Sequence, residues 1–175
     1  KVDDKKRDIL SLYQEDINKY GDNSKKILSI YQNIPGQLSN GNKKYKITAI
    51  DKKARNQNYE EELIWLDEAK IINLCNNVTD PSVGLALTKD DNHYKCYQSD
   101  VGLLVTQAFI NKPFVDNEIY KAILFDKLNV NEGMIMENYV AQTLKAKGYE
   151  LFYYFKNDND VIENNMEVDF VIVQD

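Results

Sequence analysis

The sequence predicts an α+β protein in two parts, a helical part over residues 1–99 and a mixed part over residues 100–175. Apolar residues recur at helical spacing through most of the first part, which ends in two short β-rich runs. The second part holds a further long helical pattern, followed by two more β-rich runs. No low-complexity linker separates the parts, so the boundary near Asp100 is soft.

The first two expected helices each place apolar residues on one face. These residues are Ile9, Tyr13, Ile17 and Tyr20 in the first helix and Ile27, Ile30, Tyr31 and Ile34 in the second. Gly21 is expected to end the first helix, and Pro35 the second, because proline lacks the N–H that a continuing helix needs. A short third helix is expected over residues 35–39.

An amphipathic helix is expected from Tyr59 for about three turns, leading into a strand over residues 71–75. A polar loop then reaches a second strand over residues 93–97. The expected order is therefore helices, then an exposed helix, then a hairpin. This is the order of a winged helix, in which the hairpin is the wing. Acidic side chains on the exposed helix argue against its entry into a DNA groove. They are Glu60, Glu61, Glu62, Asp67 and Glu68.

The second part begins with a short apolar helix over residues 99–109, capped by Ser99 or Asp100. A longer helix is expected from residue 130 to Gly148, since glycine favours helix termination. Two β-rich runs follow over residues 151–155 and 167–173, with a polar turn between them. This helix with two adjacent strands differs in kind from the arrangement of the first part.

Charge is distributed unevenly along the chain. The formal net charge is -6, and residues 149–175 alone carry that excess, with seven acids and one lysine. Residues 42–58 carry a net charge of +5. Their basic side chains are Lys43, Lys44, Lys46, Lys52, Lys53 and Arg55. The segment is a candidate nucleic-acid-binding surface, although a solvated lysine-rich face without a ligand explains the pattern equally well.

Several chemistries are excluded by residue type. His93 is the only histidine, and Cys75 and Cys96 form no CxxC pair, so neither a zinc cluster nor a histidine-based triad can be assembled. The run GQLSNGNKK approaches a phosphate-binding loop, but its lysine falls one place late and no strand precedes it. The cysteine usage and the lack of a long apolar run or signal peptide predict a cytoplasmic protein without a membrane partner.

Two carboxylates are the remaining candidates for chemistry. Glu137 lies between apolar positions of the long helix, and Asp169 lies inside the last β-rich run. Acids on a helix and an adjoining strand can converge on Mg²⁺, which prefers oxygen ligands. Such a nuclease site also needs a further acid and a lysine on a neighbouring strand. Without them, we favour the interpretation that Glu137 pairs with a lysine and that Asp169 lies at a solvated strand end.

Five segments in order resemble the C-terminal domain of unknown function in predicted prokaryotic AAA+ ATPases. They are IPGQLSNGNKKYKITAI, ARNQNYEEELIWLDEAKII, HYKCYQSDVGLL, EGMIMENYVAQTL and LFYYFKN…MEVDFVI. The resemblance runs from about Ile34 onward and implies a winged-helix-like segment followed by a restriction-endonuclease-like part. In that comparison Glu137 matches the acid on the helix, and Asp169 matches the aspartate of the PD-(D/E)xK pattern.

The endonuclease pattern continues with an acid-x-lysine strand, and no such element follows Asp169 in this chain. We therefore expect an incomplete endonuclease-like part, no enzyme activity from this polypeptide, and no cofactor. Mg²⁺ would bind only in a completed chain, and ATP only in the ATPase module that precedes the domain in the family.

The expected function is that of an accessory or regulatory domain that does not itself bind ATP. Its expected partners are its own N-terminal ATPase module and either DNA or another protein. The alternative is a Mg²⁺-dependent nuclease-like domain that is incomplete in this chain.

Overall fold

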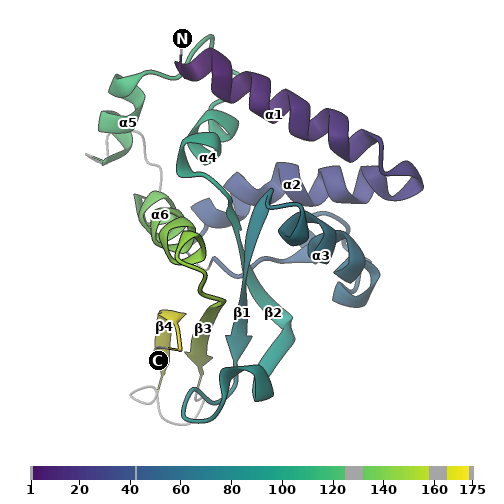
Figure 1. The fold of residues 1–175 in the computed structure, drawn as a ribbon, viewed down its shortest axis with the longest axis vertical. Coiled ribbons are helices and arrows are strands. Elements are labelled where there is room, and N and C mark those ends of the chain that lie inside the picture. The colour runs from purple at the N-terminus through teal and green to yellow at the C-terminus, as the bar shows by residue number, and fades with distance from the viewer. Residues whose placement is uncertain (1, 42, 125–131, 158–164, 174–175) are drawn as a thin grey trace.

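A mixed four-stranded sheet organises the part of the chain that the computed structural model describes, which is residues 2–41, 43–124, 132–157 and 165–173 (Figure 1). The described helices are α1 (Val2–Asn18), α2 (Ser24–Ser39), α3 (Glu60–Glu68), α4 (Val101–Ala108), α5 (Asn117–Leu124) and α6 (Glu132–Ala146). The strands are β1 (Ile72–Val78), β2 (Lys89–Gln98), β3 (Leu151–Lys156) and β4 (Met166–Val171). The expected α+β class is confirmed.

The sheet has the order β2-β1-β3-β4 and so combines strands from both sides of Asp100. β1 pairs antiparallel with β2, placing Cys75 opposite Lys95, and parallel with β3, placing Cys75 opposite Leu151. β3 and β4 are antiparallel. The hairpin expected to form a wing therefore has β1 inside the sheet, paired along both edges. The winged-helix and endonuclease-like assignments stay predictions.

Side chains of β1 and β2 alternate between the two faces of the sheet. Lys95 and Tyr97 face α6, where the Tyr97 hydroxyl donates a hydrogen bond to Glu137. Leu74 and Tyr94 lie on the opposite face and share a pocket with side chains of α3. Figure 1 shows α6 and α3 on opposite sides of β1 and β2.

The expectation that Pro35 ends the second helix is wrong, because α2 continues through Pro35 to Ser39. The separate helix expected over residues 35–39 is therefore part of α2. Proline cannot donate to the carbonyl four residues earlier, which belongs to Tyr31. The Gln107 side chain on α4 donates to that oxygen instead, from Nε2 at 3.0 Å. A side chain distant in sequence thus replaces the hydrogen bond that proline removes.

The ends of the other helices follow local signals. Gly21 and Gly148 have φ values of 75° and 88°, a conformation that favours glycine, and each follows the end of a helix as expected. Asp100 caps α4, since its Oδ1 accepts a hydrogen bond from the Leu103 N–H at 2.9 Å.

The apolar face of α1 is rotated from the expected one. Ile17 is buried as expected and Tyr13 packs partly buried against the core, but Leu10 is buried where Ile9 is exposed. Tyr20, beyond the end of α1, is also exposed. Across the described ranges, every helix is too short or too polar to cross a membrane.

Candidate functional site

A buried lysine on β2 gathers three carboxylates on the α6 side of the sheet. The side chain of Lys95 is 1% exposed. Its Nζ lies 2.8 Å from Asp169 Oδ1, 3.2 Å from Glu167 Oε1 and 3.5 Å from Glu137 Oε2. A buried ammonium is costly unless it is paired, and these three acids supply the pairing.

The strand or helix on which each acid lies determines that its side chain points toward Lys95. Glu167 and Asp169 are two residues apart on β4, so both point to the same face of the sheet. Glu137 lies on α6, which is anchored to the end of β2 by Asn138. The Asn138 side chain accepts from the Gln98 N–H at 2.8 Å and donates to the Gln98 carbonyl at 3.0 Å.

Glu137 is the most enclosed of the three acids, with 14% of its side chain exposed. Besides Lys95, it pairs with Lys43 and accepts a hydrogen bond from the Tyr97 hydroxyl at 2.9 Å. Burial and the nearby Glu137 carboxylate both raise the pKa of Tyr97, which keeps the hydroxyl protonated and able to donate.

Lys95 keeps its charge despite its burial. Burial lowers the pKa of its ammonium. The hydrogen bond to Asp169 and the charges of the three acids together raise the pKa by more than burial lowers it, so the net pKa lies above the ordinary value. The cluster is therefore a fixed cation surrounded by anionic oxygens at neutral pH.

The structure brings together Glu137 and Asp169, the two candidate acids of the sequence, at the ammonium of Lys95. Glu137 pairs with Lys43, and the Asp169 side chain is 52% exposed. Both observations also fit the interpretation in which Glu137 pairs with a lysine, Asp169 is solvated and neither acid binds a metal. Among the described residues, no three or more acids, histidines or cysteines are grouped so as to hold a metal ion. Metal binding by Glu137 and Asp169 stays a prediction.

The six basic side chains of residues 42–58 divide into two sets. Lys43 pairs with Glu137, and Lys44 lies over the Phe155 ring, so both pack against the body of the protein. The other four are exposed: Lys46, Lys52, Lys53 and Arg55. Two backbone contacts attach the segment along β2. Lys44 forms an isolated β-bridge with Lys95, and the Tyr45 N–H donates to the Tyr94 carbonyl at 2.8 Å.

Sequence reasoning missed Lys95 and Tyr97 and gave Glu167 no role. The available signal is a charged residue between two apolar residues of a strand: Lys95 lies between Tyr94 and Cys96 as Asp169 lies between Val168 and Phe170. The pattern marks Asp169 as a candidate, and Lys95 shows the same pattern in the strand expected over residues 93–97.

One family model matches residues 1–113, and its description is "Domain of unknown function (DUF8612)". The match includes the basic segment and Lys95 but ends before α6 and β4, which carry the three acids. No curated protein and no solved structure matches the chain. The relation to AAA+ ATPases stays a prediction. Because the match covers more than half of its length, this chain belongs to the family of the domain of unknown function DUF8612.

Proposed function

We propose that this chain is a non-enzymatic accessory module that binds the phosphate backbone of nucleic acid. Four exposed basic residues on one short segment carry the proposal: Lys46, Lys52, Lys53 and Arg55. Their side chains form no ion pair with any other described residue. They are thus available to phosphates, whereas Lys43 and Lys44 are engaged within the protein.

Backbone binding of this kind has a defined salt dependence. Four phosphate contacts on duplex DNA predict that log K falls with log salt with a slope of about −3 to −4. The acidic residues of α3 fit this mode better than entry of α3 into a groove, because Glu60 and Glu61 on that helix are exposed. The segment before α3, and not α3 itself, is the proposed contact.

The test measures duplex binding by fluorescence anisotropy across a range of salt concentrations. A double variant, Lys52→Glu with Lys53→Glu, should weaken binding and reduce the salt slope by about 2. The matched control is Lys5→Glu with Lys147→Glu, which changes the net charge equally at exposed positions outside the segment. Equal losses in both variants, or binding that ignores salt, would contradict the proposal.

The ATPase module implied by the family resemblance is the protein partner that we propose. Three exposed apolar side chains on α6 support docking of a protein: Met136, Tyr139 and Val140. They are spaced three and four residues apart and so share one helix face. Co-elution of the two modules should be lost in Tyr139→Ser and kept in Lys147→Ser, at an exposed position just beyond the end of α6. Unchanged co-elution of the Tyr139 variant would reject this face.

A second candidate function is Mg²⁺-dependent cleavage of nucleic acid. It is favoured by the convergence of Glu137 and Asp169, from different elements, on the buried Lys95. A metal ion would compete with the Lys95 ammonium for the same oxygens. Plasmid nicking that requires Mg²⁺ and disappears in Asp169→Asn would support cleavage. Cleavage that persists in this variant would assign the activity elsewhere.

A further inference from the structure

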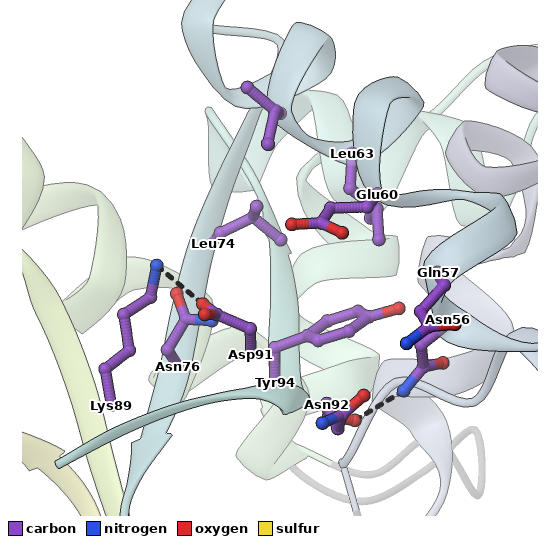
Figure 2. A pocket seen from close by; sticks show the side chains of 11 residues that line it. Asn56, Gln57, Glu60, Leu63, Leu74, Asn76, Lys89, Asp91, Asn92 and Tyr94 are labelled. Atoms are coloured by element: carbon purple, nitrogen blue, oxygen red, sulfur yellow. Dashed lines mark hydrogen bonds and ion pairs between the residues drawn. The ribbon is translucent and has the colours of Figure 1, made fainter.

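A pocket of about 380 Å³ opens on the face of the sheet opposite the Lys95 cluster. Its walls come from the 3-10 turn Asn56–Asn58, from α3 and from the β1–β2 hairpin. Figure 2 shows the Tyr94 ring between Glu60 and Asn92, with its hydroxyl directed toward Asn56 and Gln57. The pocket lies next to the basic segment along the chain, because Arg55 directly precedes Asn56.

Several polar groups in the pocket have no hydrogen-bond partner within the described part of the protein. Tyr94 is 3% exposed, and its hydroxyl has no hydrogen-bond partner within the described part of the protein. A buried hydroxyl without a partner is uncommon and calls for an explanation. The side chains of Gln57, Glu60 and Asn76 likewise make no hydrogen bond or ion pair with described residues.

Other polar groups at the rim are already paired. The Asn56 side chain donates to the Asn92 carbonyl at 2.6 Å, and Lys89 forms an ion pair with Asp91 at 2.8 Å. Among the described residues that line the pocket, Lys89 is the one cation and it is paired with Asp91, while Glu60 is an unopposed acceptor. An anionic ligand is disfavoured by this charge pattern, and a neutral group with N–H donors is favoured.

The apolar part of the lining suits a flat group. Leu63, Leu74 and the Tyr94 ring supply an apolar floor, and the amides and the carboxylate surround it. Asparagine and glutamine side chains pair with the edge of adenine, and glutamate accepts from the exocyclic amine of cytosine. Unpaired bases are recognised in this way, by apolar or aromatic contact with the ring and hydrogen bonds to its edge.

We propose that this pocket binds one unpaired nucleobase that carries an exocyclic amine, while its backbone runs along the exposed basic residues. The inference rests on the proposed function and adds a preference for single strands whose bases carry such an amine, with cytosine and adenine as the test cases. Tyr94 and Gln57 donate to ring or carbonyl acceptors, and Glu60 accepts from the exocyclic amine. Thymine has no such amine and should bind less well.

The experiment compares short single-stranded oligonucleotides of equal length and charge, composed of cytidine, adenosine, thymidine or abasic sites. By anisotropy, the cytidine and adenosine strands should bind about 5-fold or more tightly than the abasic strand, a ratio within the range for one specific base contact. Glu60→Gln and Tyr94→Phe should reduce this ratio toward one without changing the affinity for the abasic strand. The matched control is Glu61→Gln, at the next residue of α3, outside the pocket.

The outcomes separate the pocket from the backbone contact. Equal binding of all four strands, still weakened by the Lys52 and Lys53 variants, overturns the base pocket and leaves the proposed function intact. Absence of strand binding, together with Glu60-dependent binding of free cytidine by saturation-transfer NMR, rejects the backbone contact and keeps the pocket. Displacement of cytidine by an arginine-rich peptide but not by adenosine identifies a cation site and overturns the inference.

Discussion

Lys95 is a buried cation held by three acids, so its replacement tests the cluster at the scale of one residue. Lys95→Met keeps the volume of the side chain and removes its charge. Loss of one partner from a fully buried ion pair costs about 3–5 kcal/mol. Because Asp169 and Glu167 are half exposed, we expect a smaller loss of about 2–3 kcal/mol in the free energy of unfolding, measured with urea.

Two comparisons sharpen this prediction. Lys89→Met, on the same strand but exposed, should change stability little. The pKa of Lys95 is raised in the folded state, so its stabilising effect is complete below the unfolded pKa near 10.5 and declines as pH rises through the higher folded value. The difference between the wild type and Lys95→Met should therefore shrink above pH 10.5. A difference that grows with alkaline pH would contradict the assigned charge.

Cys75 and Cys96 offer a further test of single residues. Both are free and 0% exposed, and burial raises the pKa of each thiol. Since the thiolate is the reactive form, we expect neither cysteine to react with a thiol reagent at neutral pH until the protein is unfolded. Titration with and without denaturant measures this directly. Fast reaction of either thiol in the native protein would mean that the face of the sheet on which that cysteine lies opens readily.

The residues of the cluster show how far the sequence could predict the site. An acid inside an apolar run marked Asp169, and its position between apolar helix residues marked Glu137. The partner that joins them could not be inferred, because Lys95 is 74 residues from Asp169 along the chain. Its place depends on the pairing of β1 with β3, which no local pattern specifies. Sequence spacing therefore identified the acids but not the cation between them.

At the scale of elements, α2 shows why a local rule failed. Proline ends helices because a carbonyl is left without a donor, and here Gln107 supplies the donor from α4. Gln107→Ala should leave the Tyr31 carbonyl unpaired. It also removes the hydrogen bond from Gln98 Nε2 to Gln107 Oε1, which is 2.9 Å long. We expect a loss of about 1–3 kcal/mol in the free energy of unfolding.

A second substitution separates the role of Gln107 at Pro35 from its other contacts. Pro35→Ala restores an N–H that can donate to the Tyr31 carbonyl within α2. In the Gln107→Ala background, Pro35→Ala should recover part of the lost stability, and the double-mutant cycle should show coupling. Strictly additive effects would show that Gln107 does not replace the missing helical hydrogen bond.

At the scale of the whole molecule, the question is whether the two expected parts unfold together. One apolar core extends from Leu10 on α1 to Tyr153 on β3, and the sheet includes strands from both sides of Asp100. Composition and periodicity located most helices and strands, but they gave no information on this shared core. The reason is physical: β1 and β3 are brought together by a parallel crossover, and its hydrogen bonds leave no turn signature in the sequence.

A reporter in one part and a substitution in the other test whether the two parts unfold together. Trp65, the only tryptophan, lies on α3, and Asn138 lies on α6 with 0% exposure. Asn138→Ala leaves the Gln98 N–H and carbonyl without their partners, so we expect a loss of about 2–4 kcal/mol. If the parts form one cooperative unit, the Trp65 fluorescence transition in urea should move to lower concentration together with the circular dichroism transition. Lys147→Ala, just beyond α6 and exposed, should move neither. A Trp65 transition that stays in place while the circular dichroism curve splits would show that residues 1–99 fold independently of the rest.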